Sequence, residues 1–497
     1  MTCRRDRETP AIGAQHLGTV DERHDPGDHL GAARCESAAV GRRRRTRWPA
    51  VEQLHAELAF ELVQLGRRRG LRDLVALRRL RDAAELDDRQ EQPQRRDVDS
   101  IDDRDGCHRH RLYPWSASRP SADTPDMVSW EVMTSSTASS ATVRYGVIGT
   151  GMMGREHIAD LVALDGVEVT AIADTNADSL DAGSAASQHV AEPFKSHRDL
   201  LESGLCDAVV VATPDHTHVD VLADTLATDI HVLVEKPLCT TVADCQRIIA
   251  LDERRQGVAV TWVGLEYRYM PAIAELVRRV HGGEVGRTRM VAMREHRFPF
   301  LHKVDQWNRL SENTGGTLVE KACHFFDLMN LILRERPDRV MASGGQDVNH
   351  LDEVVDGRPA DMLDNAYVIV DYASGARAML DLCMFAEATH NQEEISVAGS
   401  DGKIEALIPE NLVRLGRRGE HWIGAVESMT IDDSSIAHRG LHGGSSYLEH
   451  VRFLDSIRSG TRPGATLHDG LWSVAMGVAA HRSIELGRPV HMKEVLA

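Results

Sequence analysis

Residue types that can do chemistry crowd into one short stretch, GGTLVEKACHFFDLMN, which runs from Gly315 to Asn330. Glu320 and His324 can bind a metal ion, Cys323 can act as a nucleophile, and His324 can move a proton or form the polar edge of a helix. Zinc needs a third and a fourth ligand, and no HExxH or paired His–Cys spacing accompanies this stretch. We therefore expect no metal here, and we disfavour Cys323 because it points away from His324 on a helix. Two interpretations remain, in which His324 either moves a proton or forms the polar edge of a helix. The elements around this stretch must decide between them.

A glycine-rich turn lies upstream, in VRYGVIGTGMMGREHIADLVAL, a pattern typical of a buried strand, a tight turn and a helix. The turn has the GxGxxG spacing and consists of Gly149, Thr150, Gly151, Met152, Met153 and Gly154. In a dinucleotide-binding unit the first glycine permits the turn, the second lets the backbone approach a pyrophosphate, and the third lets the helix pack on the strand. VEVTAIADTN supplies the expected second strand and ends at Asp174.

Asp174 bears on the choice of cofactor. A carboxylate at this point can accept hydrogen bonds from both ribose hydroxyls of NAD, and it repels the 2′-phosphate of NADP. Thr175 and Asn176 follow, with no arginine beside them to bind a phosphate. The sequence therefore predicts NAD as the preferred cofactor and NADP as the alternative. A second interpretation, compatible with the first, is that Asp174 caps a helix over ADSLDAGSAA.

Strands and helices continue to alternate, which predicts an α/β fold with a parallel sheet. CDAVVVATP, DIHVLVEKPL and GVAVTWVGLEYRY are apolar runs typical of buried parallel strands. Ligands of such sheets bind beyond the carboxyl ends of the strands. The loops there carry the other cofactor-binding candidates, which are Thr213, Pro214, His218, Glu235 and Lys236.

Composition limits the class of protein. With 497 residues, of which 42% are hydrophobic and 27% charged, the chain has room for two or three globular domains. It has no apolar run that could span a bilayer, and no apolar segment follows its N-terminal arginines, so we expect a cytoplasmic protein. The eight cysteines are scattered without a CxxC pair, which indicates reduced thiols. The net charge of −18 lies wholly downstream of residue 131 and disfavours nucleic acid and membrane as partners.

Residues 1–140 differ from the rest in composition. They contain arginine runs such as GRRRRTR but no lysine, the first being Lys195, and only residues 50–90 show apolar spacing suited to a helix. Three interpretations are a disordered extension, a small helical module, and translated sequence upstream of a true start at Met127 or Met133. We favour the third interpretation, because arginine without lysine is typical of a GC-rich reading frame that has not been selected to encode a folded protein. Mass spectrometry of the native N-terminus tests this.

Five stretches, taken in order, resemble the Gfo/Idh/MocA family, the glucose-fructose oxidoreductase and inositol dehydrogenase group of NAD(P)-dependent enzymes. They are GVIGTGMMGREHI, VATPDHTHVDV, VEKPLCTTVADC, VGLEYRYMPAIAEL and the stretch from Gly315. The resemblance covers roughly residues 143–497. It implies a Rossmann domain over 141–265 and a C-terminal α/β domain over 266–497 with a large, open, mainly antiparallel sheet. Members commonly form dimers or tetramers through the outer face of that sheet, which implies a homo-oligomer.

The C-terminal sequence supports such a sheet independently. DNAYVIVDYASGARAMLDLCMF shows two alternating strands about the turn 373–375. EEISVAGSDGKIEALI shows two more about SDG.

The resemblance also implies roles for the chemical groups. Oxidation of a secondary alcohol needs a base for the hydroxyl proton, while a nicotinamide takes the hydride. In the family the lysine of the EKP motif touches the reacting hydroxyl, which implies this role for Lys236, and His324 matches the general acid/base. Glu320 stands where many members carry aspartate, and on a helix it would share one face with His324. The sequence does not explain Lys321. Asp327 is predicted either to orient the His324 ring or to serve a packing or cap role.

The segment before this helix, MREHRFPFLHKVDQWNRLSENTGG, is predicted to line the substrate site. Its hydrogen-bond donors and flat apolar ring suit a polyol or a pyranose. The candidates are Arg294, His296, His302, Trp307 and Asn308. His442 and Tyr447 are predicted to close the site from the C-terminal side.

Three functions fit these residues. The leading hypothesis is an NAD(P)-dependent oxidation of a hydroxyl group on a sugar, an inositol or a related polyol. The first alternative retains NAD and uses transient oxidation for elimination or glycoside cleavage, so it forms no net NADH. The second alternative is a non-catalytic dinucleotide-binding sensor, which the presence of both Lys236 and His324 disfavours.

Overall fold

The fold is described from a computed structural model, which covers residues 141–255, 259–419 and 423–497. The predictions for residues 1–140, including the start at Met127 or Met133, lie outside these residues. No helix within the described ranges is long and apolar enough to cross a membrane.

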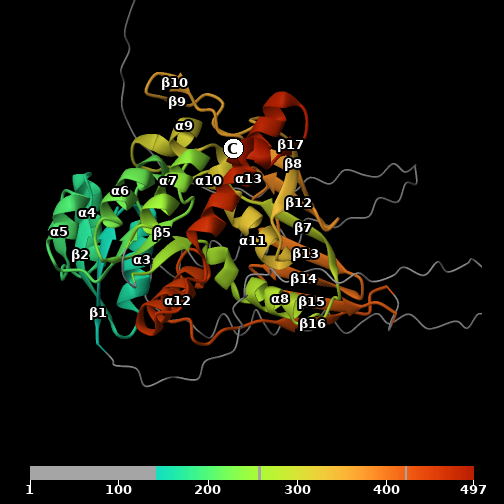
Figure 1. Cartoon of the computed structure of the whole chain (residues 1–497), viewed down its shortest axis with the longest axis horizontal. Coiled ribbons are helices and arrows are strands. Elements are labelled where there is room, and N and C mark those ends of the chain that lie inside the picture. Colours follow the sequence, from blue (N-terminus) through green and yellow to red (C-terminus); the bar gives the residue numbers. More distant parts are fainter. Residues whose placement is uncertain (1–140, 256–258, 420–422) are drawn as a thin grey trace, which may run out of the picture. The chain divides into compact units, whose positions relative to one another are not determined.

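The first part is a six-stranded parallel sheet with the order β3-β2-β1-β4-β5-β6 (Figure 1). This order is that of a dinucleotide-binding Rossmann fold, so the predicted fold class is confirmed. The strands are β1 Val143–Ile148, β2 Val167–Ala173, β3 Glu192–Phe194, β4 Ala208–Val211, β5 His231–Glu235 and β6 Thr261–Gly264. The sequence did not predict β3, because three residues containing a proline give no apolar period.

Helices flank this sheet, and every residue of β4 and β6 is buried, as expected for parallel strands covered on both faces. The helices are α3 Met152–Val162, α4 Ala177–Ala186, α5 His197–Glu202, α6 His218–Thr225 and α7 Val242–Asp252. A 3₁₀ turn, Asp215–Thr217, follows β4, and a second, Glu266–Tyr269, follows β6.

The second part is a nine-stranded sheet with the order β16-β15-β14-β13-β7-β12-β11-β8-β17. Only β7 and β12 pair in parallel, so the prediction of a mainly antiparallel sheet is confirmed. The strands are β7 Thr288–His296, β8 Pro337–Gly345, β11 Asn365–Tyr372, β12 Arg377–Cys383, β13 Glu393–Gly399, β14 Gly402–Ile408, β15 Leu412–Arg417, β16 Glu427–Thr430 and β17 Val490–His491. A small ribbon of β9 Val354–Val355 and β10 Arg358–Pro359 stands apart.

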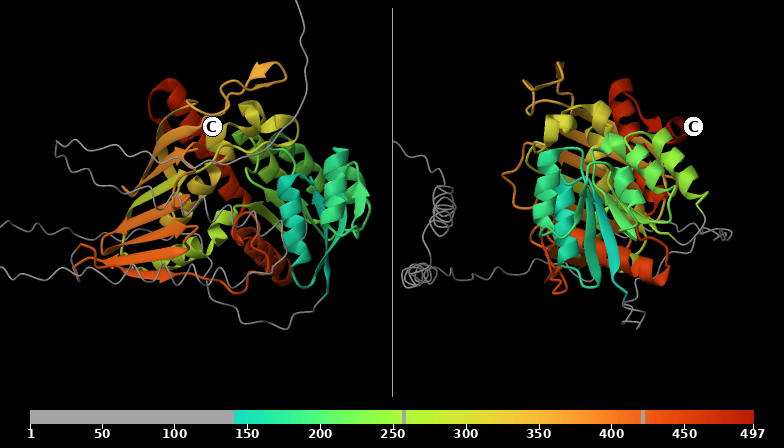
Figure 2. Two further views of the ribbon diagram at one scale, coloured as in Figure 1. Left: turned by 180° about the vertical axis from the view of Figure 1, so that it is seen from behind. Right: turned by 90° about the vertical axis from the view of Figure 1, so that its left-hand side faces the viewer.

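One face of the second sheet is covered by helices, and the other is open. Along β11, buried Ala366, Val368 and Val370 alternate with exposed Tyr367 and Ile369, as the strand period requires. Figures 1 and 2 both place α11 and α13 between the two sheets. The covering helices include α8 Pro271–His281, α11 Cys323–Leu333 and α13 Leu467–Leu486.

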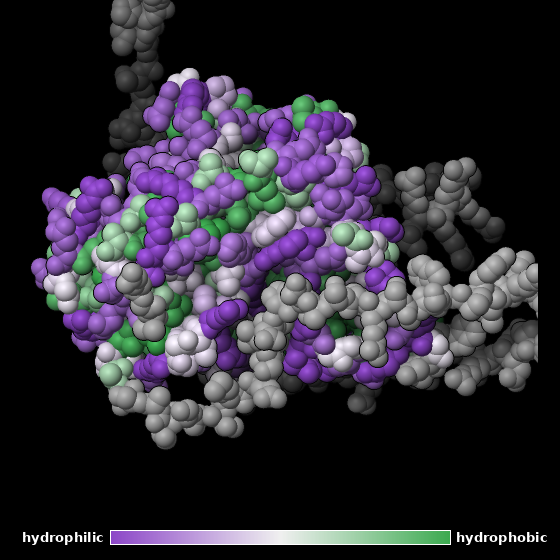
Figure 3. All heavy atoms as spheres, viewed as in Figure 1, coloured by the Kyte–Doolittle hydropathy of each residue, from purple (hydrophilic) through white to green (hydrophobic). Residues whose placement is uncertain are grey.

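The C-terminal helices also reach the first sheet. α13 packs against α7 and β6, and α12, Ser445–Ser459, packs against α3. In Figure 3 hydrophilic residues cover most of the face seen in Figure 1, with hydrophobic residues in smaller areas between them.

The helix predicted through Glu320 and His324 is interrupted. α10, Thr317–Glu320, ends after one turn, and α11 begins at Cys323. Lys321 and Ala322 form the turn between them, and the amide of Ala322 reaches back to the carbonyl of Thr317 at 3.3 Å.

Candidate active site

The glycine turn leaves open space at one of its three glycines. Gly149 has a φ of +89°, and a methyl group there would lie 2.6 Å from the carbonyl carbon of Ala212. A methyl group on Gly154 would lie 1.8 Å from the Gly149 oxygen, so the first and third glycines are needed for the turn and for packing. Nothing lies within 4 Å of a methyl group placed on Gly151. The second glycine therefore leaves the backbone before α3 open, which fits the approach of a pyrophosphate.

Asp174 lies just beyond β2 and is held by the same turn. Its carboxylate accepts hydrogen bonds from the amides of Thr150 at 2.7 Å and Asn176 at 2.8 Å. The side chain that caps α4 belongs to Asn176, which accepts from the amide of Ser179 at 2.9 Å. The prediction that Asp174 caps this helix is therefore wrong, and its carboxylate instead joins the glycine turn to the turn after β2.

His218 joins two of the predicted cofactor loops. Its Nδ1 lies 2.9 Å from the carbonyl oxygen of Pro237, its Nε2 lies 3.0 Å from that of Thr213, and the residue is fully buried. Both ring nitrogens thus face backbone carbonyls. His218 therefore holds the two loops together, and its contact with a cofactor stays a prediction, as do the contacts of Thr213 and Pro214 in the loop after β4.

Glu235 also points inward. One carboxylate oxygen lies 2.8 Å from Nε2 of His157, and the other accepts from the amide of Lys236 at 3.0 Å. Burial alone would raise the pKa of Glu235, but the hydrogen bond and charge of His157 lower this pKa to about 2. Both oxygens are in use within the protein, so Glu235 fixes the backbone of Lys236, and its contact with a cofactor stays a prediction.

Lys236 and Glu320 form an ion pair. The Lys236 Nζ lies 3.4 Å from Oε1 of Glu320 and donates to the Glu320 carbonyl at 3.2 Å. Burial opposes both charges, but each partner's charge outweighs it, so the pKa of Lys236 is raised and that of Glu320 is lowered. The side chain of Lys236 is 16% exposed, which leaves its ammonium partly open to a ligand.

His324 is a buried, neutral imidazole beside this pair. Its ring stacks on Tyr267, with centroids 4.1 Å apart and planes 8° apart, and its Nε2 lies 3.7 Å from Oε1 of Glu266. Burial and the positive charges of Lys236 and Lys321 lower the pKa of His324 well below its usual value. A neutral imidazole can accept a proton, which fits the role of a base.

Lys321, unexplained in the sequence, supports the stacked rings. Its Nζ donates to the Tyr267 hydroxyl at 2.7 Å and lies 2.9 Å from Oε1 of Glu295 on β7. The sequence offered no signal for this cluster, because its members come from three separate elements. Glu266 was missed for the same reason.

Two other predictions for α11 concern Asp327 and Cys323. Asp327 accepts from Nε of Arg268 at 2.6 Å, so the prediction that Asp327 orients His324 is wrong. Burial raises the pKa of the Cys323 thiol, which disfavours the thiolate that a nucleophile needs.

The predicted substrate residues fall into two groups. Arg294 and His296 lie on the outer face of β7, opposite to Glu295, where Arg294 pairs with Glu394. The structure therefore does not bring them together with Lys236, and their assignment as substrate contacts is corrected.

Trp307 lies nearer to the predicted cofactor loops. Its ring is 6.3 Å from that of His216, in the turn after β4, and Lys303 Nζ is 5.0 Å from its centroid. Asn308 is buried and donates to the carbonyl of Leu301 at 3.0 Å, so its amide holds the loop in place. His302 is exposed.

The two C-terminal candidates also differ. His442 Nε2 lies 4.0 Å from the Oε1 of Glu266 that faces His324, which places His442 in the site. Tyr447 is buried in α12, and the charges that act on its hydroxyl come from Asp165 and Asp160, at the other end of α3 from the glycine turn.

Comparisons with known proteins define the class. The model of the oxidoreductase family NAD-binding Rossmann fold matches residues 143–264, and the model of that family's C-terminal alpha/beta domain matches residues 277–492. Together they span most of the chain, so the protein belongs to the Gfo/Idh/MocA oxidoreductase family and carries its NAD-binding Rossmann domain. The resemblance predicted from the sequence is confirmed.

Individual relatives agree with this class. The chain is 29% identical over 360 residues to a myo-inositol 2-dehydrogenase of Thermotoga maritima, an alignment that covers 71% of this chain and all of the relative. It is 27% identical over 365 residues to an inositol 2-dehydrogenase of Saccharopolyspora erythraea, covering 71% and 97%.

Solved structures are also similar. A probable dehydrogenase from Thermotoga maritima matches with 26% identity and a TM-score of 0.58, covering 71% of this chain and all of that one. A levoglucosan dehydrogenase in complex with NADH and levoglucosan matches with 18% identity and a TM-score of 0.61, covering 71% and 99%, and this likeness supports the fold alone.

Proposed function

We propose that the protein is an NAD-dependent dehydrogenase that oxidises a secondary hydroxyl group of an inositol, a sugar or a related polyol. The observation that carries this proposal is the grouping of a charged Lys236, its partner Glu320 and a neutral His324 beyond the carboxyl end of β5. The inositol 2-dehydrogenases among the relatives support the substrate class.

The residues of the chain have separable roles in this proposal. A bound nicotinamide supplies the hydride acceptor. The Lys236 ammonium binds the reacting hydroxyl oxygen and stabilises the developing alkoxide, while His324 accepts the proton. Glu320 keeps Lys236 charged and in place. The stacked Tyr267 fixes the plane of the His324 ring.

Cofactor choice is proposed from the first sheet. Asp174 follows β2, where an acidic residue of such a fold binds the ribose, and its negative charge favours NAD over NADP. The open backbone at Gly151 and the amides at the start of α3 suit the pyrophosphate.

The experiment uses the full chain with a panel of inositols, polyols and sugars, each with NAD or NADP. We expect reduced nicotinamide to form with at least one compound and NAD, and the absorbance of NADH measures it. An enzyme that retains its cofactor and recycles it would convert a compound without net NADH. A sensor would bind NAD and convert nothing.

Variants test the proposed roles. Lys236→Met and His324→Gln should each lower kcat by at least about 100-fold, the usual scale for losing a general base or a charge-stabilising group. NAD binding, followed by fluorescence of NADH, should stay within a few-fold of the parent. Near-full activity of either variant would refute the assigned chemistry.

We also propose that two or more copies associate through the open face of the nine-stranded sheet. Met341, Ile369 and Met379 lie directly opposite one another on β8, β11 and β12 and are 50%, 51% and 36% exposed. Tyr367, two residues from Ile369 on β11, and Met290 on β7 are also exposed and enlarge this apolar area. Such a patch is typical of a protein interface. A cytoplasmic location remains a prediction, supported by the free cysteines of the described residues.

A further inference from the structure

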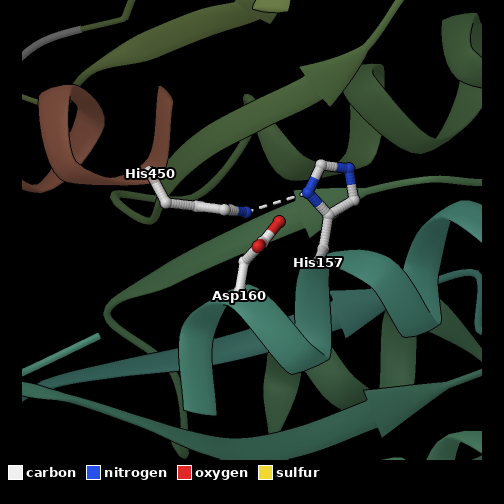
Figure 4. Close-up of side chains that lie close together, drawn as sticks. All are labelled: His157, Asp160 and His450. Carbon is white, nitrogen blue, oxygen red and sulfur yellow. Dashed lines mark hydrogen bonds between the residues drawn. The ribbon is translucent and has the colours of Figure 1, made fainter. Parts of the chain in front are cut away.

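Two histidines and an aspartate gather where α3 meets α12, and one of them, His157, also contacts Glu235 next to Lys236 (Figure 4). α3 supplies His157 and Asp160, which are three residues apart and therefore share one side of the helix, and α12 supplies His450. The three residues are 0%, 1% and 0% exposed, and one polar atom from each lies within 4.8 Å of the others. Figure 4 shows the carboxylate and both rings directed into the same small space.

Both ring nitrogens of His157 are hydrogen-bonded, and a bound ion would replace the bond between Nδ1 and His450. The Nε2 of His157 donates to the Glu235 carboxylate at 2.8 Å, so an ion could bind only at Nδ1, and binding there requires Nδ1 to carry no proton. Nδ1 faces Nε2 of His450 at 2.8 Å. A carboxylate bound to the far nitrogen is the arrangement that orients metal-bound histidines.

Hydrogen bonds within the protein do not satisfy this cluster. Asp160 Oδ1 accepts from Nδ1 of His438 at 2.7 Å, but Asp160 Oδ2 is buried without a partner. Nδ1 of His450 is also buried without a partner. A buried carboxylate oxygen that has lost its water is costly unless a donor or a cation faces it.

We propose that His157, Asp160 and His450 form a binding site for a divalent transition-metal ion, with zinc preferred. Two imidazole nitrogens and one carboxylate oxygen are ligands that zinc accepts in a tetrahedral arrangement, and water or His438 can take the fourth position. The charges of Asp160 and Glu235 together balance the two charges of the ion.

The spacing suits this ion after a small movement. Zinc–nitrogen bonds of about 2.0–2.1 Å put tetrahedral ligand atoms roughly 3.3 Å apart. The two ring nitrogens at 2.8 Å therefore need to separate by about half an ångström. The bound ion would join α3 of the first sheet to α12 near the C-terminus, so its expected role is to stabilise this contact.

The test measures metal content and does not depend on the proposed enzyme activity. The full chain, purified without a histidine tag, is stripped with a chelator, incubated with zinc and freed of excess metal. Because residues outside the described ranges include histidines and cysteines, the readout is the difference between variants. We expect His450→Gln to bind about one zinc per chain less than the parent, and His390→Gln, an exposed histidine on a loop of the second part, to bind the same amount as the parent.

Cobalt gives a second readout. Cobalt in the stripped protein should produce the visible absorption of a tetrahedral site, and Asp160→Asn, which keeps nearly the same shape, should weaken or abolish it. Zinc should also raise the melting temperature of the parent and not that of His450→Gln. Equal metal content in parent and His450→Gln, with no tetrahedral cobalt spectrum, would overturn the proposal and leave a hydrogen-bonded histidine pair. If His450→Gln does not fold, the cobalt spectra of the parent and Asp160→Asn decide.

Discussion

At the residue scale, the candidate site depends on a histidine whose pKa is lowered by burial and, in addition, by nearby cations. Burial disfavours the imidazolium first, and Lys236 and Lys321 add to this effect. A base with a lowered pKa remains ready to accept a proton in mildly acidic solution. We therefore expect the acid side of the pH profile for alcohol oxidation to lie below pH 6.5, the usual pKa of histidine.

Lys321 offers a test of this electrostatic account. Lys321→Gln removes one positive charge near His324, so the imidazolium becomes less unfavourable and the pKa of His324 rises. The acid side of the kcat profile should move upward by about one pH unit, equivalent to about 1.4 kcal/mol, with less change at high pH. The matched control is Lys403→Gln, an exposed lysine on β14. An acid side that does not move would contradict the role given to Lys321.

Asp174 carries the prediction of cofactor choice. Asp174→Ala removes the charge that repels a 2′-phosphate and the oxygens that receive the ribose hydroxyls. We expect the ratio of kcat/KM with NAD to that with NADP to fall by at least about tenfold, or about 1.4 kcal/mol. Asp178→Ala, on the exposed side of α4, serves as control. An unchanged ratio would remove Asp174 from the cofactor site.

At the element scale, the glycines of the turn between β1 and α3 have different roles, some in folding and one in binding. A methyl group on Gly154 collides with the Gly149 oxygen, so Gly154→Ala should lower the free energy of unfolding by about 1–3 kcal/mol. A methyl group on Gly151 meets nothing, so Gly151→Ala should leave stability within about 0.5 kcal/mol and weaken NADH binding by at least about tenfold. Chemical denaturation and fluorescence titration measure the two effects. Equal losses of stability would contradict this division.

The elements that could be predicted were those whose signal is local. Apolar runs gave β1, β2, β4, β5 and β6, and alternation gave β11 to β14, because burial on two faces or on one face leaves a direct trace in the sequence. The break between α10 and α11 leaves no such trace, since its residues suit a continuous helix. The contacts of Lys321 with Tyr267 and Glu295 depend on how elements that are distant in the sequence pack together. The periodicity of the sequence contains no information about this packing.

The residues of the candidate site could be predicted only in part. Lys236, Glu320 and His324 were found through motifs, and the structure brings them together. His218 and Glu235 were found through the same motifs, and their printed contacts are with other groups of the protein. Residue types and spacing do not tell whether a side chain at a strand end points outward to a ligand or inward.

At the scale of the whole molecule, the open sheet face predicts association. Ile369→Lys places a charge at the centre of the apolar row between Met341 and Met379. We expect sedimentation to show a shift from oligomer to monomer, because a charge buried without a partner at an interface is strongly unfavourable. Val162→Lys, an exposed position on α3, should leave the assembly unchanged. A parent protein that sediments as a monomer would rule out the interface.

The packing of α12 and α13 has a consequence for synthesis. These helices are among the last segments to leave the ribosome, yet they cover α3, α7 and β6, which leave early. The nascent dinucleotide-binding half therefore keeps apolar surface uncovered until translation is nearly complete. A chain truncated before Ser445 would expose that surface permanently. It would therefore be open to proteases, although it contains every residue of the glycine turn and of β5.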